Sequence, residues 1–259
     1  MTPLGINTVM YLETLQSGTP QSELLESIAT YFPIVEVRRE FVAGGNADDP
    51  AFAAEIDAIR HGVRTFNMRL YYSVPEDFCI DGRVNPNLER YLREANELTA
   101  QGMKFSVGDI PGTPLEALRE AAALIDRYGV GVTVENDQST THGSLDWALS
   151  SMLRLREADA SAIGFCYDCG NWAWAGVNPD DAFDALMDID AISEYQIKNV
   201  CFEGAGDDAH PVPSLINEGV VDWAPQVRRL AADVPVTLEY PAPIERIDDE
   251  VATVKRALA

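Results

Sequence analysis

The stretch Ile163-Gly-Phe-Cys-Tyr-Asp-Cys-Gly-Asn-Trp172 decides the fold, because a short apolar run stops there at a charged residue. An apolar run of this length, bounded by a turn residue, is typical of a strand buried on both faces. Its first charged side chain, Asp168, stands at the carboxyl end. In a barrel of parallel strands, the carboxyl ends form the rim where catalytic groups collect. Asp168 is therefore predicted to lie on such a rim.

Three further predicted strands end in a similar way: one on Glu135, one on Gln196 with Lys198, and one on Glu239. The spacings between Glu135, Asp168, Gln196 and Glu239 are 33, 28 and 43 residues. Each spacing is about the length of one strand-loop-helix-loop unit. These groups are therefore predicted to belong to consecutive, neighbouring strands.

Strand and helix patterns alternate along the whole chain. Eight strands are predicted, each followed by an amphipathic segment, at residues 4–10, 33–40, 65–72, 104–109, 130–135, 163–168, 192–198 and 234–239. Right-handed crossovers favour a closed parallel barrel. An open doubly wound sheet is the competing arrangement, but no glycine-rich phosphate turn follows the first strand. The prediction is an α/β protein with a single (β/α)8 TIM barrel domain over residues 1–259.

Two local features add detail to this prediction. Thr113-Pro-Leu-Glu116 has the form of a capping box with proline at the first helical position, and it predicts a helix start. The longest connection covers residues 202–221. Because a loop of that length is usually functional or mobile, we expect it to lie over the rim.

Composition narrows the classes of partner. The chain has 259 residues, and 42 acidic against 19 basic residues give a formal charge of −23. Such a charge repels phosphate backbones and argues against nucleic acid or an anionic membrane as a partner. No apolar run approaches the roughly 20 residues that span a bilayer. Four cysteines without a secretory signal favour a reducing cytoplasm, and a homo-oligomer is compatible with the sequence.

Three carboxylates on one rim raise each other's pKa, and a divalent cation would resolve that conflict. Glu135, Asp168 and Glu239, with the amide oxygen of Gln196, would make an all-oxygen site. Oxygen donors suit Mg²⁺ or Mn²⁺ better than Zn²⁺. The alternative is that each carboxylate is an ordinary loop residue paired with an arginine.

These strand endings resemble those of the xylose-isomerase-like TIM barrels, which include sugar-phosphate isomerases and epimerases. The segments that carry the resemblance are Val134-Glu-Asn-Asp-Gln138, Tyr167-Asp-Cys-Gly-Asn-Trp172, Tyr195-Gln-Ile-Lys-Asn199, Leu238-Glu-Tyr-Pro241, Val35-Glu-Val-Arg-Arg-Glu40 and Asn217-Glu-Gly-Val-Val-Asp-Trp223. The subgroup that the chain most resembles accompanies 2-ketogluconate use in bacteria.

The resemblance implies a metal held by Glu, Asp, His and Glu, which places Glu135, Asp168 and Glu239 as ligands. Gln196 occupies the histidine position, and this departure puts metal affinity and catalytic competence in doubt. The implied reaction is a proton shift through a metal-stabilised cis-enediolate on a small sugar or sugar acid. Glu135 and Glu239 would be the acid and base. Lys198, on the same face as Gln196, could hold an oxyanion, unless it is a surface lysine.

Five other residues are candidates for binding substrate. Arg38 and Arg69 could grip a carboxylate or phosphate, or could instead pair with a structural carboxylate. The resemblance implies that Asn171 contacts substrate oxygens. Trp172 could form an apolar wall for a sugar face, although packing under a loop explains it as well. His210 lies in a predicted rim loop, with a surface position as the alternative.

Two other functions remain open on the same scaffold. A dehydratase would expel a β-hydroxyl from the enediolate of a sugar-derived acid. A non-catalytic sugar-binding barrel would explain Gln196 in place of histidine. Abasic-site endonucleases share the scaffold, but they need a histidine-rich zinc site and a positive surface. Three histidines and a charge of −23 exclude that function.

Overall fold

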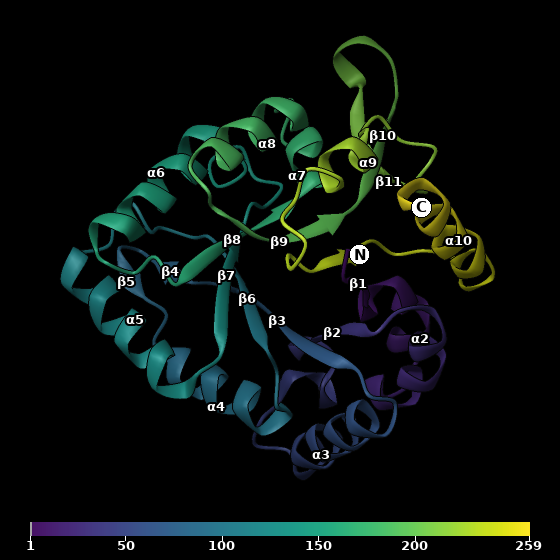
Figure 1. Cartoon of the computed structure of the whole chain (residues 1–259), viewed down its shortest axis with the longest axis horizontal. Coiled ribbons are helices and arrows are strands. Elements are labelled where there is room, and N and C mark those ends of the chain that lie inside the picture. Colours follow the sequence, from purple (N-terminus) through teal and green to yellow (C-terminus); the bar gives the residue numbers. More distant parts are fainter. Residues whose placement is uncertain (1) are drawn as a thin grey trace.

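Eight parallel strands close into a barrel around which the rest of the chain is arranged (Figure 1). The computed structural model describes residues 2–259. Each barrel strand pairs with the next along the chain, and the last pairs with the first. The TIM barrel prediction is therefore confirmed. The barrel strands are β1 (Leu4–Asn7), β2 (Ile34–Arg38), β3 (Arg69–Asp77), β6 (Gly102–Ser106), β7 (Gly131–Glu135), β8 (Ile163–Asp168), β9 (Ile192–Ile197) and β12 (Val236–Leu238).

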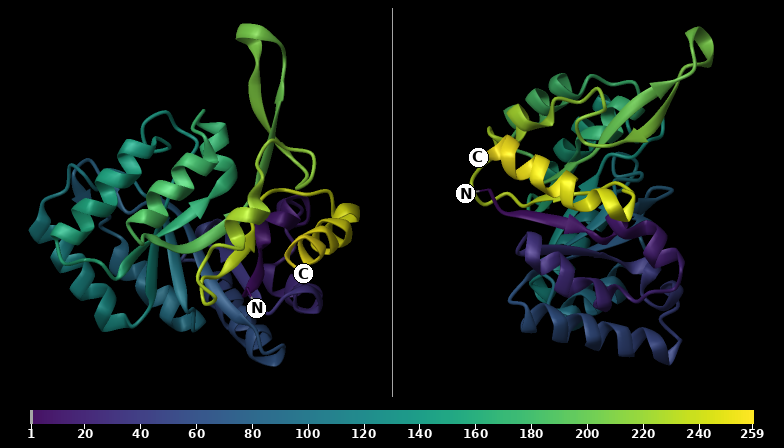
Figure 2. Two further views of the ribbon diagram at one scale, coloured as in Figure 1. Left: turned by 45° about the horizontal axis from the view of Figure 1, so that its top comes forward. Right: turned by 90° about the vertical axis from the view of Figure 1, so that its right-hand side faces the viewer.

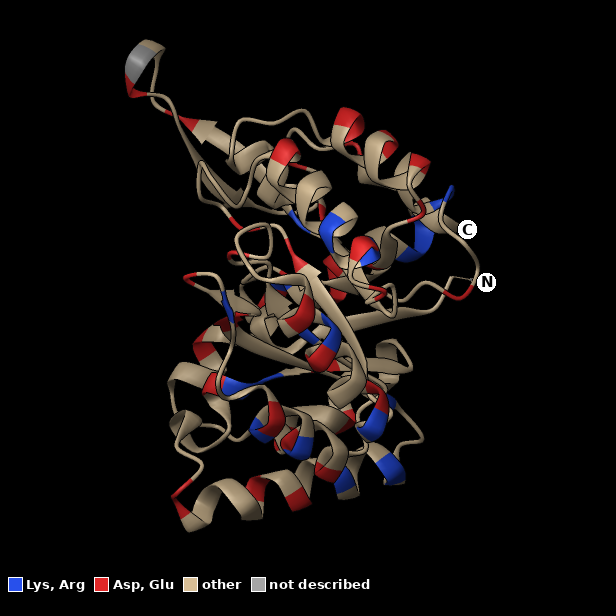
Figure 3. Cartoon of the chain, turned by 90° about the vertical axis from the view of Figure 1, so that its left-hand side faces the viewer, with Lys and Arg blue, Asp and Glu red and all other residues tan. Residues whose placement is uncertain are grey.

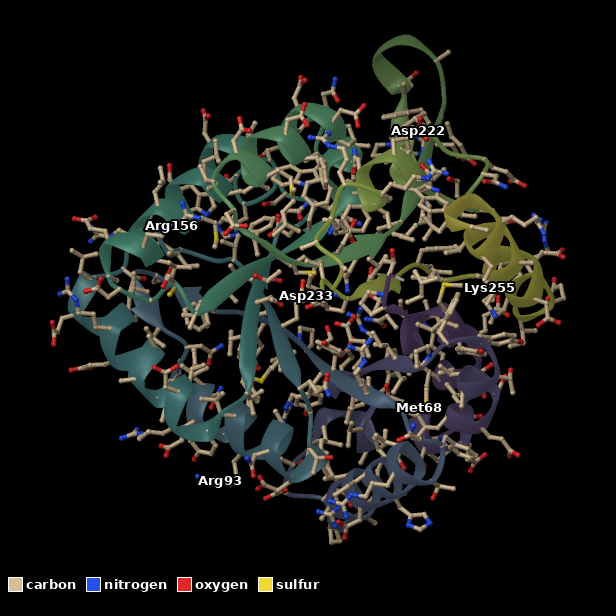
Figure 4. The ribbon with its side chains drawn as sticks, viewed as in Figure 1. Met68, Arg93, Arg156, Asp222, Asp233 and Lys255 are labelled. Carbon is tan, nitrogen blue, oxygen red and sulfur yellow. The ribbon has the colours of Figure 1, made fainter. Side chains whose placement is uncertain are left out.

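The helices form a ring outside the strands, because the apolar face of an amphipathic helix is buried against the barrel. In α4, for example, Leu88, Tyr91, Leu92, Ala95 and Leu98 are buried. Exposed Arg93 lies on the outer side of the ring (Figure 4). The helices are α1 (Leu12–Gln16), α2 (Leu25–Tyr31), α3 (Pro50–Thr65), α4 (Leu88–Leu98), α5 (Leu115–Tyr128), α6 (Leu145–Glu157), α7 (Cys169–Trp174), α8 (Pro179–Asp188), α9 (Trp223–Val227) and α10 (Ile247–Leu258).

Helix ends follow local capping chemistry, with one exception to the prediction. The side chain of Asp49 accepts a hydrogen bond from Ala51 at the start of α3, and Gly129 ends α5 in the left-handed conformation. The predicted capping box at 113–116 does not form. Thr113 Oγ1 instead donates to the carbonyl of Asp109, and α5 begins without a side-chain cap.

Strand register places the polar strand endings at matching heights. Asp168 is the parallel partner of Gln196, and Gln196 is the partner of Thr237. Because side chains alternate between the two faces of a strand, Gln196 and Asp168 point into the barrel together. The residues two positions further along, such as Lys198 and Glu239, lie one layer nearer to the rim.

Two short hairpins leave the barrel. The first joins β4 (Cys79–Ile80) to β5 (Arg83–Val84), and the second joins β10 (Asn199–Glu203) to β11 (His210–Ser214). The second hairpin fills much of the long connection at 202–221. It extends outward beyond the ring of helices in each view (Figures 1 and 2). The expectation that this connection lies over the rim is therefore wrong, because antiparallel pairing organises it as a projecting arm.

Acidic residues are spread over the helices and loops, with fewer basic residues between them (Figure 3). Within residues 2–259, no helix is both long enough and apolar enough to cross a membrane.

Candidate active site

Three carboxylates from three barrel strands converge at the carboxyl end of the barrel. Glu135 ends β7, Asp168 ends β8, and Glu239 directly follows β12. One carboxylate oxygen from each of them lies within 4.8 Å of the other two. Asp168 is fully buried and Glu239 is 6% exposed, whereas Glu135 is partly open to solvent. The rim thus concentrates three carboxyl groups where water is mostly excluded.

The backbone around Asp168 fixes the position of its carboxylate. Asp168 Oδ1 accepts hydrogen bonds of 2.9 Å from the N–H groups of Gly170 and Asn171, and so caps α7. Asn136 also holds the main chain of Asp168, through bonds of 3.0 and 3.1 Å to its carbonyl and N–H. Only Oδ2 of Asp168 remains free to face the rest of the site.

Lys198 lies between two of the carboxylates. Its Nζ is 3.3 Å from Asp168 Oδ2 and 3.3 Å from Glu239 Oε2. Burial lowers the pKa of Lys198, but Asp168 and Glu239 outweigh burial and raise it above its ordinary value. The lysine stem passes over Gly170, where an added Cβ would lie 2.7 Å from Lys198 Cγ. Glycine at position 170 is therefore required for the Lys198 side chain to reach Asp168 and Glu239.

Arg38 holds the second oxygen of Glu239. Its Nη1 lies 2.6 Å from Glu239 Oε1, while its Nε lies 2.6 Å from Glu40 Oε1. Arg38 ends β2, which is separated from β12 only by β1 around the barrel. Both oxygens of Glu239 are thus paired with cations, one of them Arg38 and the other Lys198.

A second layer of polar groups lies beneath the rim. Lys104 Nζ is 2.9 Å from Glu135 Oε2 and 2.8 Å from Gln196 Oε1. The amide nitrogen of Gln196 donates a 2.9 Å bond to Glu36 Oε2. Lys104, Gln196 and Glu36 are all buried. This layer connects β2, β6, β7 and β9 across the inside of the barrel.

The pKa values of the two rim glutamates, Glu135 and Glu239, are shifted in opposite directions. Burial raises the pKa of Glu135 to about 8, against the opposing effect of Lys104. Burial would also raise the pKa of Glu239, but Lys198, Lys104 and Arg38 outweigh it and hold that pKa at about 2. The raised pKa favours the neutral form of Glu135, and the lowered pKa favours the ionised form of Glu239. Such a difference is the arrangement that acid and base catalysis needs.

A cavity of about 290 Å³ opens onto these groups. This volume lies at the lower end of the range for ligand sites and suits a small molecule. Its lining is mostly polar and consists of Arg38, Ser73, Val74, Pro75, Ser106, Glu135, Asn136, Asp137, Gln138, Asn171, Lys198 and Glu239. A larger hollow of about 580 Å³ borders α1 and α3, where small apolar side chains dominate the lining. Glu135 and Glu239 of the carboxylate cluster face the smaller cavity.

Most of the residues singled out in the sequence come together here. Glu135, Asp168 and Glu239 form the carboxylate cluster, and the polar residues beside them line the cavity or lie below it. The latter group contains Arg38, Asn171, Lys198 and Gln196.

Three predicted substrate-binding residues lie elsewhere. Arg69 is the first residue of β3, so it lies at the opposite end of the barrel from the rim. Trp172 is fully buried in α7 with its ring packed against Phe165 and Tyr167, and it is part of the core. His210 is exposed on the β10–β11 arm. The structure thus does not bring these three side chains to the cavity.

Several polar residues of the site had no role in the sequence-based prediction. Asn136 and Gln138 lie in the loop after Glu135 and line the cavity. Glu36 and Lys104 form the layer below. The available signal for Lys104 was its place inside an apolar strand, in a chain with only three lysines. A charged residue in a buried strand is costly unless it is paired.

The donor set fits a hard divalent cation in part. Three carboxylate oxygens within 4.8 Å of one another make Glu135, Asp168 and Glu239 a candidate metal site. A cation bound there would compete with Lys198 for oxygens of Asp168 and Glu239. The oxygen of Gln196 accepts a hydrogen bond from Lys104, and its predicted role as a fourth ligand stays a prediction.

Solved structures with this fold cover almost all of the chain, at low sequence identity. The probable 3-DHS dehydratase AsbF from Bacillus anthracis, involved in petrobactin synthesis, aligns with a TM-score of 0.69 and 16% identity, over 98% of both chains. A D-psicose 3-epimerase, solved in the presence of D-fructose, gives 0.67 and 13% over 99% of both. The IOLI protein with a binding zinc atom gives 0.67 and 12%, over 99% of this chain and 96% of that one. At these identities, the likeness shows the fold alone.

No curated protein matches the sequence. A family model does: the model described as "Xylose isomerase-like TIM barrel" matches residues 93–257, which include all three rim carboxylates. This chain therefore belongs to the xylose isomerase-like TIM barrel family.

Proposed function

We propose that this chain is an isomerase or epimerase for a small sugar or sugar-derived acid, with a divalent cation held by Glu135, Asp168 and Glu239. The observation that carries the proposal is the convergence of these carboxylates on one small polar cavity, with the pKa values of Glu135 and Glu239 shifted in opposite directions. One base and one acid on the same cavity are what a proton shift next to a carbonyl requires.

In this mechanism, Glu239 is the base. It removes the proton from the carbon beside the substrate carbonyl, and the electron pair of that C–H bond moves into an enediolate. For epimerisation, Glu135 returns a proton to the opposite face of the same carbon. For isomerisation, the proton of the neighbouring hydroxyl first moves to the former carbonyl oxygen, and Glu135 then protonates the former carbonyl carbon. Lys198 donates hydrogen bonds to the oxygen on which negative charge develops. A bound divalent cation would supply Lewis-acid polarisation of the carbonyl and its adjacent hydroxyl.

Amide side chains would orient the substrate. Asn171 and Gln138 line the cavity, and Gln138 Nε2 donates a 3.1 Å hydrogen bond to Asn171 Oδ1. Each amide keeps further donors or acceptors for sugar hydroxyls. Because both cations of the lining, Arg38 and Lys198, already contact Glu239, hydroxyl recognition falls mainly to these amides.

The test is proton exchange with solvent. The purified protein is freed of metal with a chelator, resupplied with Mg²⁺, Mn²⁺ or Zn²⁺, and incubated with ketoses, aldoses and sugar acids in D₂O. Loss of the α-proton signal by NMR is expected with Mg²⁺ or Mn²⁺ and not without metal. Glu135→Gln should slow the exchange by about 10² or more, since general acid–base catalysis contributes that much. Failure of the resupplied native protein to exchange any α-proton contradicts the proposal.

Dehydration is the second candidate function, and the raised pKa of Glu135 favours it. A neutral carboxyl group beside the substrate could protonate a β-hydroxyl as it leaves from the enediolate, which releases water. Product analysis separates the two functions. A new ultraviolet-absorbing enone, with loss of water, identifies a dehydratase, whereas an isomerase conserves the mass of the sugar.

A further inference from the structure

A buried ammonium group lies directly beneath the rim carboxylates. Lys104 is 3% exposed, and its Nζ faces Glu135 Oε2 at 2.9 Å, Gln196 Oε1 at 2.8 Å and Glu36 Oε1 at 3.4 Å. The ammonium group donates a hydrogen bond to Gln196 Oε1 and forms ion pairs with the carboxylates of Glu135 and Glu36. Turning Lys104 away would leave buried charges unpaired, which is strongly destabilising. The lysine is therefore held firmly in place.

The two partners of Gln196 fix the direction of its amide. Lys104 can only donate, so the atom that faces it must be the amide oxygen. The Glu36 carboxylate accepts, so the atom that faces it, at 2.9 Å, must be the amide nitrogen. Rotating the amide by half a turn would oppose donor to donor and acceptor to acceptor. Gln196 is thus a link between Lys104 and Glu36.

Glu36 lies at the inner end of this series of connected side chains, and its position is equally well defined. Glu36 is fully buried, and besides Gln196 and Lys104 it is approached by Thr237 Oγ1 at 3.5 Å. Lys104 supplies the positive charge that balances Glu36 in this dry interior. The connected groups run from Glu36 through Gln196 and Lys104 to Glu135.

We propose that Lys104 is a positioning residue that holds one oxygen of Glu135, and that Gln196 supports Lys104 instead of binding the cation. The inference rests on the proposed function, because it concerns the same carboxylates. With Oε2 held by Lys104, Glu135 presents Oε1 to cation and substrate. The protein then supplies three carboxylate ligands, and the remaining positions are left to water and the substrate's oxygens.

Two substitutions of similar size test this arrangement: Lys104→Met and Gln196→Met, alone and together. The readouts are the Kd for Mn²⁺, from the free-ion EPR signal, and kcat and KM for α-proton exchange. Lys104→Met should lower kcat about 100-fold with KM nearly unchanged, since a small displacement of a catalytic group can cost that much. Gln196→Met should lower kcat about tenfold and leave the Kd for Mn²⁺ within about threefold. The kcat of the double variant should be no lower than that of Lys104→Met, because both residues act on Glu135 through the same series of contacts.

A metal-free measurement keeps the inference separate from the proposed function. Urea unfolding of the same three variants without metal should show non-additive losses of stability, because the two residues are direct partners. This result does not depend on catalysis or on metal. A native protein that exchanges no proton would refute the proposed function, and the unfolding cycle and the Mn²⁺ titration would still decide the role of Lys104.

Two outcomes would overturn the inference. A Kd for Mn²⁺ that rises tenfold or more in Gln196→Met, but not in Lys104→Met, would make Gln196 a ligand. Additive stability losses would show that the residues act independently. If Lys104→Met does not fold, the Kd of Gln196→Met decides the same question, since only a ligand role predicts its loss of Mn²⁺.

Discussion

Arg38 Nη1 lies 2.6 Å from Glu239 Oε1, and this pair joins two residues that are 201 positions apart in the chain. The guanidinium group of Arg38 also pairs with Glu40 through Nε, so two of its nitrogens contact carboxylates. Arg38 thereby holds one oxygen of the proposed catalytic base, and together with Lys198 and Lys104 it lowers the pKa of Glu239.

Replacing Arg38 should move the acid limb of the pH–rate profile. The depressed pKa of Glu239, about 2, means that its ionised form is lost only as the pH falls through that value. Arg38→Met removes one of the cations that lower this pKa, so activity should be lost at a higher pH. Arg38→Lys is the matched control, since it keeps the positive charge but not the planar set of guanidinium donors. The acid limb of its pH–rate profile should move less. Coincident acid limbs in the native and Arg38→Met proteins would contradict this assignment.

Removing the ammonium group of Lys198 should tighten metal binding and slow catalysis. Lys198 occupies oxygens of Asp168 and Glu239 that a cation would need, so Lys198→Met should lower the Kd for Mn²⁺. Proton exchange should fall because no donor then faces the developing oxyanion, by about 10² or more. Isothermal titration with Mn²⁺ measures the first effect. Lys255→Met, on the exposed side of α10, should change neither quantity, and weaker Mn²⁺ binding by Lys198→Met would refute the competition.

A methyl group at position 170 should displace Lys198. The added Cβ of Gly170→Ala would lie 2.7 Å from Lys198 Cγ and 2.8 Å from its Cβ, too close for either side chain to remain in place. Overpacking of this kind typically costs about 1–3 kcal/mol of folding free energy. Urea unfolding should show that loss, and exchange activity should fall as in Lys198→Met. Unchanged activity in a folded Gly170→Ala protein would show that the lysine path is not required.

Stability should fall as the pH rises toward 8, because of a buried carboxyl group below the rim. Burial, followed by the nearby Glu36, raises the pKa of Glu194 to about 8, although Lys104 and Thr133 oppose the rise. The folded protein then holds a proton that the unfolded chain releases near its ordinary pKa. This group therefore stabilises the fold below that ordinary pKa, and its contribution is lost as the pH rises through about 8.

Glu194→Gln removes that titration while it keeps the shape of the side chain. Between pH 6 and 8, the native protein should lose stability faster than the variant, by up to about 1.4 kcal/mol per pH unit. Urea unfolding at several pH values measures both slopes. Parallel slopes would mean that Glu194 ionises near its ordinary pKa in the folded state.

The sequence alone was sufficient for the barrel and for the carboxylate cluster. Short apolar runs that end on Glu135, Asp168 and Glu239 determine both, because the carboxyl ends of parallel strands must meet on one rim. The placement of Lys198 followed from the same alternation, two residues beyond Gln196.

Tertiary structure decided the partners of these groups and the location of the remaining candidates. Arg69 begins a strand instead of lying within one, because β3 starts four residues later than the pattern predicted, and Trp172 turns into the core with α7. The contact between Lys104 and Gln196 joins β6 to β9 across the barrel interior. Periodicity tells which face of a strand a side chain occupies, but closure of the barrel determines which side chain it meets there. That is the physical reason why the sequence determined the carboxylate rim, and only the folded barrel determined the cations that surround it.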